Sequence, residues 1–361
     1  MPRRVKIAIV GCGWVALTDY FPALSGPHLS ESVELTAVCD VAEARARQVA
    51  EQYGAAEVWS DYDEMLRRTN AEAIVLLTPI PLHFGQGLAA IESGRPTYIQ
   101  KTMTVTYDQA RQLIEAADRR GVLLCASPGQ MLDPAHREAK RLIDEGAVGR
   151  PYYARGQGSH PGHENVETYG IDPTWYYRPG GGPVMDVAVY PLHSLTGLLG
   201  SVKRVTALSG VVEPNRTYQG RPIDVQMDDS TLLLLDFGGN VFAEVNGTYC
   251  QVARNTPQVE IYCRSGVLQL GGWSRPSVPL EVHGEVGGGK GWYRPDRLAR
   301  PIKHTVHDLV HFAECVRDGA RPIHSAGHAA HVIEVIEKGY LAARSGQAQS
   351  VGSAFQVPMS P

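Results

Sequence analysis

Short apolar runs alternate with amphipathic segments along the first third of the chain. Runs of strand length occupy residues 5–10, 33–39, 73–77, 97–99 and 122–125. Segments of helical character occupy residues 42–53, 61–68, 84–92 and 107–119. Apolar strands separated by helices are typical of a parallel sheet with right-handed crossovers. The pattern therefore predicts an α/β domain over residues 1–127, with a doubly wound parallel sheet of the Rossmann type.

The pattern changes after residue 127, where longer strand candidates follow one another. They occupy residues 152–157, 204–212, 230–237, 240–249 and 259–270, and the last contains a hairpin turn at 264–266. Helices are expected at residues 135–145, 306–317 and 326–345, and the glycine-rich stretch 284–300 is expected to be a loop near a ligand or partner. Strands without intervening helices predict an open, mainly antiparallel sheet. Residues 128–361 are thus expected to form an α+β domain that binds substrate and mediates oligomerisation.

Composition and charge argue against nucleic-acid and membrane partners. Hydrophobic residues make up 43%, charged residues 20%, and the formal net charge is −4, so no basic surface is expected to bind nucleic acid. No apolar run approaches the roughly 20 residues that span a bilayer, and no signal peptide is recognised, so no membrane partner is expected. The six cysteines include no Cys-x-x-Cys pair. This usage favours reduced thiols and a cytoplasmic location.

A glycine loop between the first strand and the following helix predicts a dinucleotide site. The loop residues expected to contact the cofactor are Gly11, Cys12, Gly13, Trp14 and Val15. In this pattern the glycines allow a tight turn and a close approach of pyrophosphate to the backbone. Asp40, at the end of the second strand, is expected to bind the adenosine ribose and to repel a 2′-phosphate, which favours NAD over NADP, although Arg45 would soften that preference. The alternative is a structural glycine turn with an N-capping aspartate.

The order of motifs resembles the Gfo/Idh/MocA oxidoreductase family along nearly the whole chain. The matching pieces are the glycine loop, Asp40, residues 60–66, Thr78-Pro79-x-x-x-His83, Gln100-Lys101-Thr102, residues 180–186 and residues 308–312. The resemblance implies a Rossmann domain, a second domain with an open sheet, and cofactor contacts from Thr78, Pro79, His83, Gln100 and Lys101. Family members usually carry Glu-Lys-Pro where this chain has Gln100-Lys101-Thr102.

The resemblance also implies a catalytic set. Lys101 is expected to donate a hydrogen bond to the reacting oxygen, the alternative being a solvated charge at a strand end. The family segment Asp-x-Gly-x-His is here Asp186-Val187-Ala188-Val189-Tyr190, which makes Tyr190 the expected proton donor or acceptor and Asp186 the residue that orients Lys101 or the substrate. Tyr190 is alternatively a core tyrosine. If the segment is helical, His193 lies on the same face as Asp186 and Tyr190, and it is either a core histidine or a substrate contact.

Further histidines and aromatic residues suggest substrate contacts. The loop with His160 and His163 is expected to border the substrate-binding cleft and to contact sugar hydroxyls, and Tyr176 is expected to stack on a sugar ring. The alternative is an ordinary surface loop. Histidines at 304, 307 and 311 and at 324, 328 and 331 have helical spacing, but without a recognised metal motif they are interpreted as packing residues, and no metal is expected.

The combined interpretation is an NAD(P)-dependent dehydrogenase or reductase. It would transfer hydride between nicotinamide and a hydroxyl or ketone of a sugar, polyol or glycoside-like substrate. One alternative is a redox-neutral glycoside hydrolase or epimerase that keeps NAD tightly bound, and another is a non-catalytic sugar- or nucleotide-binding sensor. An open sheet with an apolar face needs a cover, so a homodimer or homotetramer is expected.

Overall fold

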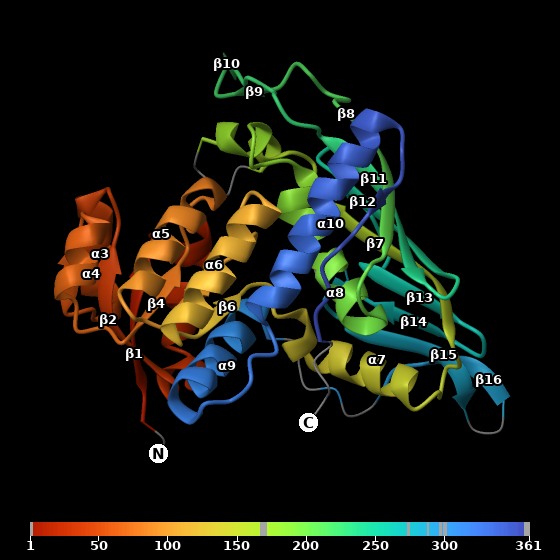
Figure 1. The fold of residues 1–361 in the computed structure, drawn as a ribbon, viewed down its shortest axis with the longest axis horizontal. Coiled ribbons are helices and arrows are strands. Elements are labelled where there is room, and N and C mark those ends of the chain that lie inside the picture. The colour runs from red at the N-terminus through yellow and green to blue at the C-terminus, as the bar shows by residue number, and fades with distance from the viewer. Residues whose placement is uncertain are drawn as a thin grey trace. The chain divides into compact units, whose positions relative to one another are not determined.

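The computed structural model describes residues 3–166, 172–272, 275–286, 289–295, 298 and 302–356, which form two compact units (Figure 1). Unit 1 comprises residues 1–129 and 302–330, and unit 2 comprises residues 130–301 and 331–361. The first boundary lies close to the predicted one at residue 127. Residues 302–330 differ from the prediction, because they group with the first unit and not with the second.

Unit 1 contains a six-stranded parallel sheet with the strand order β3-β2-β1-β4-β5-β6. The strands are β1 (Val5–Val10), β2 (Val33–Cys39), β3 (Glu57–Trp59), β4 (Ala73–Leu76), β5 (Thr97–Ile99) and β6 (Leu124–Ala126). The predicted doubly wound sheet is confirmed, although the three-residue strand β3 was not predicted. The strand order reverses between β1 and β4, which is where ligands bind at the carboxyl ends of such sheets.

Helices flank this sheet. They are η1 (Ala16–Tyr20), α1 (Phe21–Leu24), α2 (Pro27–Ser30), α3 (Glu43–Tyr53), α4 (Tyr62–Arg68), α5 (Ile80–Glu92), α6 (Tyr107–Arg120) and α9 (His304–Asp318). The helices α5 and α6 pack against each other, as Figure 1 shows. Leu309 and Phe312 of α9 are fully buried in the same apolar core as Ile7 and Ile9 of β1. This shared core explains why residues 302–330 belong to unit 1.

Unit 2 contains a nine-stranded sheet with the order β16-β15-β14-β13-β7-β12-β11-β8-β17. The strands are β7 (Pro151–Ser159), β8 (Arg204–Gly210), β11 (Ser230–Gly238), β12 (Val241–Thr248), β13 (Val259–Cys263), β14 (Val267–Leu270), β15 (Leu280–Val286), β16 (Gly289–Tyr293) and β17 (Gln349–Ser350). β7 and β12 are parallel and the other neighbours are antiparallel, which confirms the predicted mainly antiparallel sheet. A separate hairpin joins β9 (Thr217–Tyr218) to β10 (Arg221–Pro222).

The expected loop at residues 284–300 is wrong over its first half. Residues 284–286 end β15, and residues 289–293 form β16, the antiparallel edge strand. The ring of His283 packs edge-on against Trp292 across this pair, with ring centroids 5.3 Å apart. The cross-strand contact stabilises a hairpin despite the glycines that suggested a loop. Residues 287, 288, 296, 297, 299 and 300 of the stretch lie outside the described residues.

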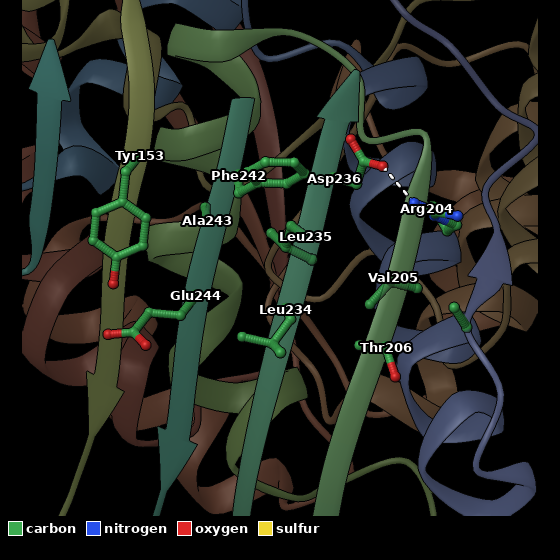
Figure 2. A pocket seen from close by; sticks show the side chains of 11 residues that line it. Tyr153, Arg204, Val205, Thr206, Leu234, Leu235, Asp236, Phe242, Ala243 and Glu244 are labelled. Atoms are coloured by element: carbon green, nitrogen blue, oxygen red, sulfur yellow. Dashed lines mark hydrogen bonds and ion pairs between the residues drawn. The ribbon is translucent and has the colours of Figure 1, made fainter. Parts of the chain in front are cut away.

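The two faces of the unit 2 sheet differ. The helices of the unit are α7 (Pro134–Asp144), α8 (Val189–Leu199) and residues 331–345 of α10 (Ala326–Ser345). Its short helical turns are η2 (Gln130–Leu132), η3 (His163–Asn165), η5 (Thr174–Tyr177) and η6 (Val184–Ala188). α8 packs on β7 and β13. On β11, Leu233 and Leu235 are buried on this inner face, whereas Leu234 on the outer face is 48% exposed (Figure 2). No helix among the described residues is long and apolar enough to cross a bilayer.

Candidate functional site

The backbone of the glycine loop of unit 1 requires glycine at position 11. Gly11 has φ +92°, and a Cβ on it would lie 2.9 Å from the carbonyl carbon of Leu77. Its amide donates to the carbonyl of Cys39 at 2.8 Å, which holds the loop to the end of β2. A Cβ on Gly13 would meet no described heavy atom within 4 Å. The loop therefore leaves open space beside its backbone, as a pyrophosphate cradle requires.

Asp40 is an anion held directly against this loop. Its Oδ2 accepts the amide N–H of Cys12 at 2.7 Å, and its Oδ1 accepts from the amide of Ala42 at 2.8 Å and from Arg45 at 2.7 Å. Burial opposes ionisation, but the hydrogen bonds from Arg45 and the two amides outweigh it and hold the pKa of Asp40 below its usual range. Trp14 and Val15 are partly buried and lead from the loop into η1.

His83 joins the two loops that follow β4 and β5. Its ring is fully buried, with Nδ1 2.9 Å from the carbonyl oxygen of Thr102 and Nε2 2.6 Å from that of Thr78. Burial lowers the pKa of His83, and a neutral ring donates to one of these oxygens. The cofactor contact of His83 stays a prediction. In the structure, His83 fixes the Thr78 loop relative to the loop that carries Lys101.

The segment that carries Lys101 continues from β5 at the carboxyl edge of the sheet. The amide of Gln100 donates to the carbonyl of Leu76 at 3.0 Å, and the Gln100 side chain is buried. Lys101 itself is partly exposed, and Thr102 behind it is buried. Thr78 donates to Gln86 at 2.5 Å, and Pro79 occupies the N-cap of α5. Thr78, Pro79, Gln100 and Lys101 thus lie on the loops that follow adjacent strands of one sheet.

In unit 2, the segment that carries Asp186 rests directly on the sheet. The segment is helical in the structure and consists of the π-helical turn η6 followed by the α-helix α8. Gly158 of β7 pairs with Gly247 of β12 beneath η6. A Cβ on Gly158 would lie 2.4 Å from the backbone of Val187 and Ala188, so only glycine allows this approach. Single π-helical turns occur frequently at functional sites.

Asp186 binds two side chains that are distant in sequence. Its Oδ2 lies 2.7 Å from Nε2 of His163 and accepts the hydroxyl of Tyr249 at 2.9 Å. Asp186, His163 and Tyr249 are all buried. The sequence placed Asp186 and His163 in different groups, as a catalytic and a substrate-binding residue, and the structure brings them together. Tyr249 was missed, because nothing in the local pattern distinguishes it from a core tyrosine.

His163 lies within a column of stacked rings. The His163 ring lies 3.5 Å from that of Tyr176 at an interplanar angle of 11°, and 4.4 Å from that of His160. Trp175 continues the column at 3.9 Å from Tyr176. The amide of Gly162 donates to Nδ1 of His160 at 3.2 Å. The three predicted substrate residues of this region, His160, His163 and Tyr176, therefore form one packed unit.

An ionic network behind the column was not predicted. Arg216 donates to Glu164 at 2.5 Å and to Asp229 at 2.9 Å, and its guanidinium lies 5.0 Å from the ring centroid of Tyr177. The hydroxyl of Tyr177 in turn donates to Glu164. Arg216 comes from the segment before the β9–β10 hairpin, where no motif marks it. The network fixes the turn η3 that carries His163.

The remaining predicted residues of α8 are buried. Tyr190 is 8% exposed and stays a predicted proton-transfer residue. His193 is 3% exposed, and its Nδ1 lies 2.9 Å from the carbonyl oxygen of Val189 one turn earlier. Burial lowers the pKa of His193 to about 4. These features favour the core interpretation of His193 over a substrate contact.

Two family models match the chain. The model described as "Oxidoreductase family, NAD-binding Rossmann fold" matches residues 5–127, and the model described as "GFO/IDH/MocA C-terminal domain" matches residues 136–269. The two matches lie in unit 1 and unit 2, respectively.

Proteins with assigned activities are similar over most of the chain. A scyllo-inositol 2-dehydrogenase (NAD(+)) of Bacillus subtilis is 26% identical over 325 residues, which cover 90% of this chain and 89% of the relative. A D-apiose dehydrogenase of Paraburkholderia graminis is 25% identical, covering 96% of this chain and 89% of the relative. The structure of a levoglucosan dehydrogenase in complex with NADH and levoglucosan superposes with a TM-score of 0.83 at 19% identity, covering 97% of this chain and 100% of that one. The last likeness shows a shared fold.

Proposed function

Because the chain belongs to the Gfo/Idh/MocA oxidoreductase family, we propose that it is an NAD(P)-dependent dehydrogenase acting on a hydroxyl group of a sugar, polyol or glycoside-like substrate. The observation that carries the proposal is the open glycine loop beside the ionised Asp40, at the carboxyl ends of a parallel sheet. The glycine backbone and η1 would hold the pyrophosphate, and Asp40 would hold the ribose. When bound, the nicotinamide cofactor supplies the hydride chemistry.

The protein's own residues would manage the hydroxyl proton. We assign Lys101 to donate a hydrogen bond to the reacting oxygen and Tyr190 to accept or return its proton. Asp186 would orient Lys101 or the substrate hydroxyls, and its carboxylate also binds His163 and Tyr249. The partly exposed rings of Tyr176 and His160 supply apolar and hydrogen-bonding surface suited to a hydroxyl-rich substrate.

NAD is the proposed cofactor in preference to NADP. A 2′-phosphate would be placed beside the Asp40 carboxylate and would be repelled by it. Arg45 is the nearby cation suited to such a phosphate, but it donates to Asp40 at 2.7 Å and is thereby oriented toward the carboxylate. The relatives include both NAD- and NADP-dependent enzymes, so this preference depends on the local geometry of Asp40.

A substrate screen tests the proposed function. We expect the purified chain to reduce nicotinamide when given NAD and at least one compound from a panel of inositols, aldoses and glycosides. The kcat/KM with NAD should exceed that with NADP by about tenfold or more, because a tenfold ratio needs only about 1.4 kcal/mol. Turnover without net change in reduced-nicotinamide absorbance, on protein with copurified NAD, would show redox-neutral chemistry and contradict the proposal.

The outer face of the unit 2 sheet is proposed as the contact with a second copy of the chain. Leu208 is 76% exposed, and Leu234 and Phe242 are about half exposed on the same face (Figure 2). On this face Arg155 donates to Glu244 at 2.7 Å, so the face presents a positive and a negative group. A two-fold contact between identical faces can pair such groups across the interface. Light scattering should give at least a dimer mass, and Leu234→Asp should lower it. A monomer at micromolar concentration would overturn this assembly.

A further inference from the structure

A buried carboxyl group on α9 ends a chain of hydrogen bonds inside unit 1. Asp308 is fully buried, its Oδ2 accepts the hydroxyl of Tyr98 at 2.9 Å, and its Oδ1 accepts the amide of Gly129 at 3.0 Å. The hydroxyl of Tyr98 also lies 2.8 Å from that of Tyr20, and both tyrosines are fully buried. Asp308 begins residues 308–312, a matching piece of the family resemblance to which the proposed reaction gives no role.

The partners of Asp308 come from elements that carry the candidate cofactor site. Tyr20 ends η1, the helical turn that follows the glycine loop. Tyr98 lies in β5, just before Lys101, and Gly129 follows β6, the neighbour of β5 in the sheet. All of these residues lie in unit 1. We propose that Asp308 is a positioning residue of the NAD site and that its ionised form strengthens NAD binding. The inference rests on the proposed function, since it concerns the same site.

The charge on Asp308 determines the direction of the hydrogen bonds in this chain. A tyrosine hydroxyl has one hydrogen to donate, and an ionised carboxylate only accepts. Tyr98 gives its hydrogen to Asp308, so Tyr20 is the donor in the 2.8 Å contact between the two tyrosines. A hydrogen bond to a charged acceptor is stronger than one between neutral groups. The carboxylate therefore holds β5 directly and η1 through the hydroxyl of Tyr98.

Protonation of Asp308 would reverse the direction of this chain. The amide of Gly129 donates to Oδ1, so the added hydrogen would lie on Oδ2, which faces Tyr98. Tyr98 would then accept from Asp308 and donate to Tyr20. The charge-assisted bond is lost in this form, and the hold of Asp308 on η1 and β5 becomes weaker.

Asp308 changes its charge near neutral pH. Burial raises the pKa of Asp308 to about 7, which outweighs the opposing effects of its hydrogen bonds and of His311, one turn further along α9. Burial also raises the pKa of Tyr98 and that of Cys125 well above their usual values, so both stay neutral. The titratable side chains that contact Asp308 or its neighbours come from η1, β5, β6, α9 and the segment before α10: Tyr20, Tyr98, Cys125, His311, Cys315 and His324.

Calorimetry of NAD binding to the full chain, between about pH 5.5 and about pH 8.5, tests the proposal. We expect the affinity of the wild type to rise by about tenfold over this range, a difference that one charge-assisted hydrogen bond can supply. Binding and ionisation are reciprocal, so NAD should also release protons near the pKa of Asp308. The proton release is measured as a dependence of the binding heat on the ionisation enthalpy of the buffer.

Asp308→Asn places a neutral amide where the protonated acid would be. At the alkaline end of the range this variant should bind NAD about tenfold more weakly than the wild type. Its affinity should not change with pH, and NAD binding should release no protons. Asp318→Asn is the matched control, because Asp318 ends the same helix with a side chain that is 52% exposed. The control should follow the wild-type curve.

Tyr20→Phe keeps the proposal falsifiable if the amide disturbs the packing. This change leaves Asp308 and Tyr98 in place but removes the hydroxyl that links them to η1. NAD affinity should then be low and nearly independent of pH, whereas Tyr53→Phe on α3, whose ring stacks on Phe21, should behave as the wild type does.

The two possible failures are distinguishable. A wild type that binds NAD with the same affinity at every pH would overturn the inference alone. So would an Asp308→Asn or Tyr20→Phe variant that keeps the wild-type pH dependence and proton release. A wild type that binds no nicotinamide cofactor at any pH would overturn the proposed function, and the inference with it.

Discussion

Lys101→Ala is expected to lower kcat/KM by about a thousandfold or more, while NAD binding stays within about threefold. A thousandfold loss corresponds to about 4 kcal/mol of transition-state stabilisation. We expect this loss because Lys101 follows β5 at the carboxyl edge of the sheet, where the cofactor is proposed to bind. His83 fixes its loop through the carbonyl of Thr102. Steady-state kinetics and a fluorescence titration with NAD measure the two quantities. Lys203→Ala, at an exposed lysine, should change neither.

Tyr190→Phe is tested by the same kinetic measurement. The change removes only the hydroxyl from a buried ring. A loss of about 100-fold or more is expected from a proton-transfer residue. Tyr153→Phe on the outer face of the sheet is the matched control. If both Lys101→Ala and Tyr190→Phe retain activity within threefold, the assigned catalytic residues are wrong.

Arg216→Ala is expected to produce the largest loss of stability among the single changes considered. The Arg216 side chain is 4% exposed, and its partners Glu164 and Asp229 are 7% and 0% exposed. Removing the guanidinium leaves two buried carboxylates without their cation, which typically costs about 3–5 kcal/mol. Urea denaturation should show this loss in the free energy of unfolding of unit 2.

Arg204→Ala is the control for Arg216. Arg204 also pairs with a carboxylate, Asp236, at 3.0 Å, but its side chain is 60% exposed. Exposed pairs contribute about 0–1 kcal/mol, so the control should unfold nearly as the wild type does. Equal losses of unfolding free energy in Arg216→Ala and Arg204→Ala would contradict the expectation that burial makes the Arg216 pairs more important for stability.

The secondary structure of unit 1 was predictable because its signals are local. Buried parallel strands are continuous apolar runs, and α6 has a complete capping box from Thr106 and Gln109 and ends at Gly121 in the left-handed region. The start of α5 was placed four residues too late, at residue 84 instead of 80. Prolines at the beginning of that helix were the signal that should have moved it.

The sequence predicted a local contact of the candidate site but not its contacts between residues that are distant in the chain. Gly11 and Asp40 were paired correctly, because one βαβ unit brings them together and the Cys12 amide joins them. The contact of His163 with Asp186 and that of Arg216 with Glu164 span 23 and 52 residues. No periodicity connects such positions, since tertiary packing alone decides them. The π-helical turn η6 likewise has no sequence signature and follows from its close seat on the sheet.

The paired glycines under η6 determine which parts of unit 2 are free to change during evolution or engineering. A side chain at Gly158 would collide with the backbone of Val187 and Ala188, and one at Gly247 would lie 3.1 Å from the Ala188 Cβ. The contact between the strands and η6 therefore tolerates no side chain at Gly158 or Gly247. Because η6 carries Asp186, the position of Asp186 is fixed by the same contact. We therefore expect variation that alters substrate choice in the segments around Asp186, such as the turns that carry His160 and Tyr176, the proposed substrate contacts. A directed-evolution library confined to those turns should yield more active variants than one that includes the glycines.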